Sequence, residues 1–141
     1  MKLSTHFSLE ELTYSVTAHN RGIDNSPSDA VLFELKKLAE NVLEPLRLAY
    51  GKPIVVTSGY RCLELNKAVR GAATSQHLKG QAADITSLAN TPEENKRLFD
   101  CAVRLIESGK IRVGQCIDEY GYKWVHISTP FRKVNQVLHL R

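Results

Sequence analysis

The sequence predicts an α+β fold in which a small antiparallel sheet packs against helices. Apolar residues recur at helical spacing over 31–46 and again over 98–106. Short β-branched or alternating segments lie at 54–57, 82–86 and 124–128. The length of 141 residues, with 43% hydrophobic and 24% charged residues, fits one soluble globular domain that spans the whole chain.

Helix start signals define the longer helices. A capping box predicts a short helix over 9–13, and Ser26-Pro27 predicts the start of a long core helix that ends near Tyr50. Pro45 should interrupt this helix near its last turns, because proline lacks an N–H. The remaining elements are assigned from local composition: a loop at 15–26, a short helix at 63–69, a capping box at 91–94 whose helix ends at Gly109, a strand at 111–119, a hairpin turn at 120–123, and an unassigned basic tail from 130.

Cysteine usage and charge limit the functional classes. The three cysteines, at 62, 101 and 116, are odd in number and widely spaced, so we expect small buried hydrophobes and folding in a reducing compartment. The net charge of +4 and the pI of about 9.0 favour anionic partners. No nucleic-acid reader motif appears, and we expect no nucleic-acid partner. The N-terminus has no signal-peptide core and no run is long enough for an integral membrane segment, so we expect synthesis in the cytoplasm.

The chain is organised around the segment from Ser75 to Asp84, which holds His77 and Asp84 with Gly80 between them. Asp84 falls in one predicted strand, and His126 falls in another. If these strands pair antiparallel, the two side chains lie opposite each other with Cβ atoms about 5 Å apart. Two imidazoles and one carboxylate with a fourth position open match a catalytic zinc site. The spacing alone is weak, because an aspartate at a strand end also serves as a cap.

Two groups of residues resemble the zinc D-alanyl-D-alanine peptidases. They are Ser75-x-His77-x-x-Gly80-x-Ala82-x-Asp84 followed by Trp124-Val125-His126, and upstream Ser58-Gly59-Tyr60-Arg61 followed by Leu65-Asn66. The resemblance covers roughly residues 7–128. That family includes D-Ala-D-Ala carboxypeptidases, vancomycin-resistance dipeptidases and phage endolysins, and it shares the hedgehog/DD-peptidase fold.

The resemblance implies roles for individual residues. His77, Asp84 and His126 would be the ligands of Zn²⁺. Arg61 would hold the scissile carbonyl as it becomes an oxyanion, and Ser75 would contact the substrate or the surroundings of the metal. The other histidines of the chain, at 6, 19 and 139, are expected to be surface side chains.

The general base is where the sequence departs from the family. The family usually has Glu or Asp three residues before the second histidine, and here that position is Lys123. Asp118 and Glu119 lie close by, across the predicted turn. We favour Glu119, because a longer side chain tolerates imprecise placement. The alternative is that both carboxylates are turn residues in a solvated loop.

These inferences lead to a zinc metallopeptidase, of D,D-carboxypeptidase or endopeptidase type, that acts on peptidoglycan peptides at a bond involving D-alanine. We expect a monomer that reaches the cell wall after release, as in a phage or prophage setting. One alternative is a non-catalytic zinc-containing module that binds peptidoglycan, which Lys123 favours. Another is a nucleic-acid binder that relies on the basic surface.

Overall fold

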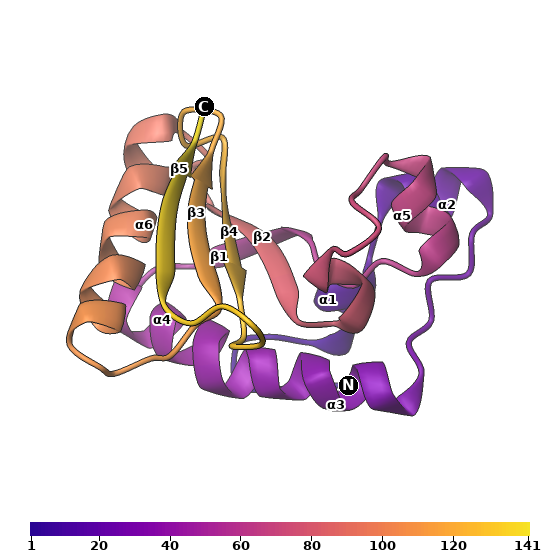
Figure 1. Cartoon of the computed structure of the whole chain (residues 1–141), viewed down its shortest axis with the longest axis horizontal. Helices are drawn as coiled ribbons and strands as arrows, with labels where there is room; N and C mark the ends of the chain where they lie inside the picture. The colour runs from indigo at the N-terminus through magenta and orange to yellow at the C-terminus, as the bar shows by residue number, and fades with distance from the viewer.

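A five-stranded sheet forms the centre of the computed structural model, which describes all 141 residues (Figure 1). The strand order is β1-β2-β4-β3-β5. The strands are β1 (Ile54–Ser58), β2 (Ala82–Ser87), β3 (Gln115–Glu119), β4 (Trp124–Ser128) and β5 (Gln136–Leu140). Every neighbouring pair is antiparallel except β3 and β5, which run parallel. The predicted α+β class, with a small and mostly antiparallel sheet, is confirmed.

Helices flank this sheet on one side and at one end. They are α1 (Leu9–Thr13), α2 (Val16–Arg21), α3 (Asp29–Leu38), the π-helix η1 (Ala39–Leu43), α4 (Glu44–Tyr50), α5 (Leu63–Ala68), the 3₁₀-helix η2 (Gln76–Lys79) and α6 (Pro92–Glu107). In Figure 1, α6 runs beside the sheet, α3 lies below it, and α2 and α5 lie together at the far end. None of these helices combines the length and apolar character needed to cross a bilayer.

Alternation along the strands separates a core face from an open face. On β4, Val125 and Ile127 are fully buried toward the helices, and Ile85 of β2 is buried with them in the same core cluster. Asp84 and His126 occupy the intervening positions, which a pleated strand directs to the other face. The same pleat that builds the core therefore presents polar side chains on the open face.

The predicted core helix is continuous from Asp29 to Tyr50 but contains a π segment. Pro45 lies in the first turn of α4, directly after that segment. A π segment widens the helical backbone, and this one lies next to the position where Pro45 removes a hydrogen bond. It is the predicted interruption of the helix, a few residues earlier than expected. The helix starts two residues later than Ser26-Pro27 predicts, because the side chain of Ser28 accepts the hydrogen bond from the Val31 N–H.

Three local predictions were wrong. The segment 15–26 is not all loop, because Ser15 caps α2 and Gly22, at φ 66°, ends it. The capping box at Thr91 is half formed, since the carboxylate of Glu94 bonds Tyr50 and Arg97 instead. The strand expected from 111 begins at 115.

The basic tail contains β5, which no sequence pattern indicated. Asn135 sets its start, because its N–H donates to the Val113 carbonyl at 2.7 Å and its Oδ1 accepts the Val113 N–H at 2.9 Å. Both cysteines beyond α5, Cys101 and Cys116, are buried as expected, whereas Cys62 is only half buried at the start of α5.

Candidate metal centre

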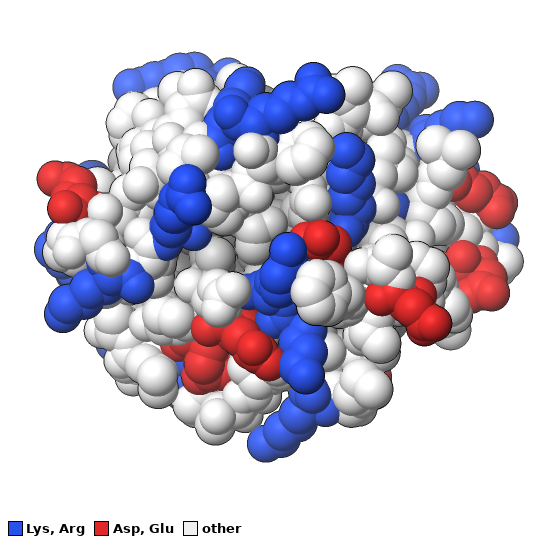
Figure 2. Space-filling model, turned by 60° about the horizontal axis from the view of Figure 1, so that its bottom comes forward, with Lys and Arg blue, Asp and Glu red and all other residues white.

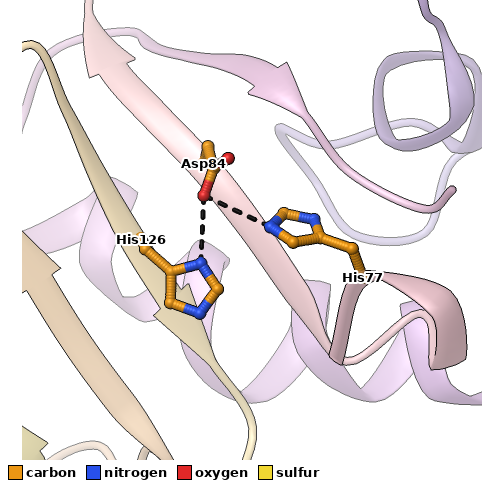
Figure 3. A group of neighbouring side chains, drawn as sticks. All are labelled: His77, Asp84 and His126. Carbon is orange, nitrogen blue, oxygen red and sulfur yellow. Dashed lines mark hydrogen bonds and ion pairs between the residues drawn. The ribbon is translucent and has the colours of Figure 1, made fainter. Parts of the chain in front are cut away.

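Three side chains from separate elements converge on the open face of the sheet (Figure 3). Asp84 and His126 are direct partners in the β2–β4 register, and His77 reaches them from η2. Asp84 Oδ1 lies 3.0 Å from His126 Nδ1 and 3.3 Å from His77 Nε2. One potential ligand atom from each of the three residues lies within 4.8 Å of the others. The predicted pairing of Asp84 with His126 is therefore present in the structure.

The local chain fixes the position and tautomer of His77. Its backbone N–H donates to Ser75 Oγ at 3.2 Å, and Gly80, at φ 72°, ends η2 immediately afterwards. A Cβ on Gly80 would come within 2.9 Å of a Val31 methyl group, so glycine is needed for space as well as for conformation. His77 Nδ1 lies 2.7 Å from the Gly59 carbonyl and donates to it, which leaves Nε2 free to bind a cation.

The electrostatics of Asp84 suit a carboxylate that binds a metal cation. Burial acts to raise the pKa of its carboxyl, but the hydrogen bonds from His126 and His77 outweigh burial and hold the pKa well below its usual range. The carboxylate is therefore ionised at neutral pH. Two imidazole nitrogens and one carboxylate oxygen this close together fit Zn²⁺ and leave a coordination position for water or substrate.

Arg61 lies beside the cluster and is tied to it through the backbone. Its backbone N–H donates to the His77 carbonyl at 3.1 Å, and its side-chain Nη2 donates to Ser75 Oγ at 3.4 Å. Burial lowers the pKa of its guanidinium, while the charges of Asp84 and Glu119 act in the opposite direction. Its buried Nε has no partner within the protein. Arg61 therefore brings a positive charge to the site, and Ser75 holds both Arg61 and His77.

Sequence reasoning missed two residues that hold this arrangement together. Asn25 Oδ1 accepts the Cys62 N–H at 2.7 Å, and its Nδ2 donates to the carbonyls of Thr13 and Tyr60, each at 2.9 Å. Gly59 packs so tightly that a Cβ there would lie 2.2 Å from the Leu12 carbonyl oxygen. Gly59 stood in the motif without an assigned role, whereas nothing in the sequence singled out Asn25.

The structure separates the two candidate bases. Glu119 pairs with Trp124 in the β3–β4 register and so shares the face of His126, and the Trp124 indole N–H donates to Glu119 Oε2. Asp118 pairs with Val125, is buried on the core face, and bonds His139 instead. Glu119 is therefore brought to the face that carries the His77, Asp84 and His126 cluster, and Asp118 is not.

Lys123 is exposed in the turn before β4. Its backbone N–H donates to the Glu119 carbonyl at 3.1 Å, which closes the hairpin. The structure thus uses the backbone of Lys123 to hold Glu119 at the end of β3.

A pocket of about 630 Å³ adjoins the cluster. Ser75 and His126 line it, so a molecule in the pocket would lie against the candidate metal centre. The volume is within the range of about 300–1,000 Å³ typical of small-molecule sites.

The fold and the site define a class of protein: an α+β domain with a His-Asp-His group that could hold a metal ion on the open face of its sheet. The family model of Peptidase M15 matches residues 5–128, and the chain belongs to this family. The resemblance to zinc D-Ala-D-Ala carboxypeptidases is thus confirmed at the level of the family. No curated protein matches the chain significantly. Membership of the family indicates a metal-dependent peptidase, of a group that typically uses zinc, with a peptide as substrate.

Proposed function

We propose that this protein is a zinc peptidase of bacterial cell-wall peptides, which hydrolyses a bond involving D-alanine. The observation that carries the proposal is the convergence of His77, Asp84 and His126 beside a pocket large enough for a peptide. The family match supports peptide hydrolysis in general. The choice of cell-wall peptides rests on the motif resemblance.

The three ligand atoms would be His77 Nε2, Asp84 Oδ1 and His126 Nδ1. A zinc ion held there would lower the pKa of bound water toward about 7 and polarise a carbonyl group. The hydrogen bond from His77 Nδ1 to the Gly59 carbonyl would keep that ring in the ligating tautomer.

Two further side chains would act on the substrate. The guanidinium of Arg61 would stabilise the negative charge that develops on the scissile carbonyl oxygen. Glu119 would accept a proton from the attacking water through Oε1, because Oε2 is occupied by the Trp124 indole. Glu119 and His126 are diagonal neighbours on one face of the sheet. Diagonal neighbours on adjacent strands lie about 7–8 Å apart, and a glutamate side chain can span much of that distance.

The setting of the reaction is part of the same proposal. The protein would be made in the cytoplasm and reach the cell wall after release, as in a phage or prophage, and would act as a monomer. The basic composition favours the anionic surface of such a wall.

One observation favours a second function. Lys123 stands where the family usually carries a carboxylate, which would suit a zinc-containing module that binds peptidoglycan peptides without cleaving them. In that case the zinc-loaded protein would bind cell-wall fragments and leave their masses unchanged.

Mass spectrometry of muropeptides tests the proposal. Purified peptidoglycan fragments are incubated with the zinc-loaded protein, with and without a chelator. The proposal predicts shortened peptides that end at or begin with D-alanine, and no shortening in the presence of the chelator. Intact peptides under both conditions would contradict it and favour the binding module.

A further inference from the structure

The pocket beside the candidate metal centre is positively charged. Twelve residues line it, and the charged side chains among them are those of Lys79, Arg132 and Lys133, with no Asp or Glu. On the face that Figure 2 shows, basic side chains lie among acidic ones. The charged residues that line the pocket all have one sign, and a cleft lined by one sign of charge concentrates the field inside it.

The three cations are free to bind a ligand. Lys79, Arg132 and Lys133 form no ion pair, and none of their side chains donates a hydrogen bond within the protein. Lys79 and Arg132 instead lie close to one aromatic ring. Lys79 Nζ is 4.4 Å from the centroid of the Phe131 ring, and Arg132 Cζ is 5.7 Å from it. The ring thus gathers two positive charges that come from different elements.

The loop that carries Arg132 and Lys133 is anchored at both ends. The Thr129 N–H donates to the Gln81 carbonyl at 2.9 Å, and the Gln76 side chain donates to the Thr129 carbonyl at 3.3 Å. Asn135 fixes the other end through Val113. The loop follows residue 128, where the family match ends. The cationic wall is therefore supplied largely by this chain's own segment beyond the match.

We propose that Lys79, Arg132 and Lys133 form an anion subsite, which binds a carboxylate on an acidic residue of the substrate peptide. This inference rests on the proposed function and names the class of substrate that it would prefer. A guanidinium binds a carboxylate with two parallel hydrogen bonds, and neighbouring ammonium groups add charge. Because Ser75 and His126 line the same pocket, one peptide would fill the subsite while its backbone crosses the candidate metal centre.

Three forms of one peptide separate the possible sources of the carboxylate. The parent is L-Ala-D-Glu-L-Lys-D-Ala-D-Ala, linked through the side chain of D-Glu so that the α-carboxylate of that residue is free. In the second form this carboxylate is an amide, and in the third the C-terminus is an amide. KM and kcat are measured for each with the zinc-loaded protein, and binding of each uncleaved peptide is measured by calorimetry in the presence of a chelator.

The double variant Arg132→Gln/Lys133→Gln tests the residues. Its control is Lys110→Gln/Arg112→Gln, which removes the same two charges from exposed positions that do not line the pocket. The wild type and the control should bind the parent about tenfold more tightly than the form with the amidated acidic residue, and the double variant should lose this preference through KM, with kcat unchanged. The preference should also weaken at high salt, because exposed charges are screened.

The outcomes separate the two proposals. Equal KM and equal binding of the first two peptides by the wild type would overturn the subsite, as would a double variant that behaves like the control. Loss of affinity only with the C-terminal amide would also overturn it, because the carboxylate would then belong to the chain end. Failure to cleave any form would count against the proposed function alone, because calorimetry still reports on the subsite.

Discussion

The nitrogen that His77 would present to a metal is determined by one hydrogen bond. Its Nδ1 donates to the Gly59 carbonyl at 2.7 Å, so Nε2 is the ring nitrogen on the side of Asp84. The ring is also almost fully buried. A ligand that is fixed in tautomer and orientation before the metal arrives loses little freedom on binding, which is the usual function of such outer partners.

Arg61 is expected to act on charge that appears during the reaction. Arg61→Ala should retain the fold and the zinc, and kcat on a cell-wall peptide should fall by about a hundredfold or more, because a fixed donor to the developing oxyanion is lost. Arg61→Lys should recover only part of the rate, since an ammonium does not reproduce the planar guanidinium. Steady-state kinetics with zinc content as a check would measure this, and an unchanged kcat would assign Arg61 to structure.

Glu119 and Asp118 give opposite expectations although they are adjacent. Glu119→Gln should lower kcat by about 10²–10⁴-fold with zinc retained, because the proton acceptor on the open face is removed. Asp118→Asn should leave kcat near the wild-type value and lower stability, since Asp118 is buried and bonds His139. The two variants are compared on one substrate at one pH. A slow Asp118→Asn enzyme and a fast Glu119→Gln enzyme would reverse the assignment.

At the scale of elements, the site depends on two contacts between segments. The β2–β4 register places Asp84 opposite His126, and the turn after β1 delivers Gly59 and Arg61 to the same place. The Tyr60 N–H donates to the Leu12 carbonyl at 2.7 Å, so the end of α1 supports this turn.

Gly59→Ala is expected to disturb both the fold and the metal site. A Cβ would lie 2.2 Å from the Leu12 carbonyl oxygen, and backbone must move to relieve that clash. Overpacking of this kind costs about 1–3 kcal/mol of unfolding free energy, measurable by urea denaturation. Zinc affinity should fall with it, because the Gly59 carbonyl orients His77. Wild-type stability and zinc affinity in the variant would show that the turn has room to adjust.

The side-chain contact between α4 and α6 should make the free energy of unfolding depend on pH. Hydrogen bonds from Tyr50 and then Arg97 lower the pKa of Glu94 from 4.5 to about 2. A lowered pKa in the folded state contributes stability above pH 4.5, and this contribution is lost as the pH falls toward about 2. Glu94→Gln should therefore lower the urea midpoint at neutral pH, and its difference from wild type should shrink in acid.

A matched variant controls for general charge effects. Glu93→Gln removes the neighbouring carboxylate, which forms no ion pair, and should change the urea midpoint little at either pH. A Glu94→Gln difference that stays constant or grows in acid would show that the ionised carboxylate does not stabilise the contact between the helices.

Over the whole molecule, the features that could be predicted from the sequence were those that depend on local patterns. Alternation in 82–86 and 124–128 correctly assigned Asp84 and His126 to one face, because strand pleat has a fixed period of two. The same rule distinguishes Glu119 from Asp118 only after the length of the turn fixes the register at Glu119 opposite Trp124. That register depends on tertiary pairing, so the sequence favoured Glu119 only for the length of its side chain and did not show which carboxylate shares the face of His126.

The elements that were missed depend on contacts remote in the chain. β5 forms because the edge of β3 accepts it and Asn135 bonds Val113, 22 positions away. Asn25 joins α1 to the turn that carries Arg61, across 35 positions to Tyr60 and 37 to Cys62. α2 is short and polar, so its serine cap and terminal glycine define it better than any apolar periodicity.

The zinc content of matched histidine variants tests the central claim most directly. Elemental mass spectrometry should find about one zinc per chain in the wild type, and almost none in His77→Ala or His126→Ala, because three protein ligands are needed to hold the ion. His19→Ala is the matched control, since His19 is exposed and makes no side-chain hydrogen bond, and it should keep its zinc. Full zinc in a folded His126→Ala protein would contradict the assignment of His77, Asp84 and His126 as the metal centre.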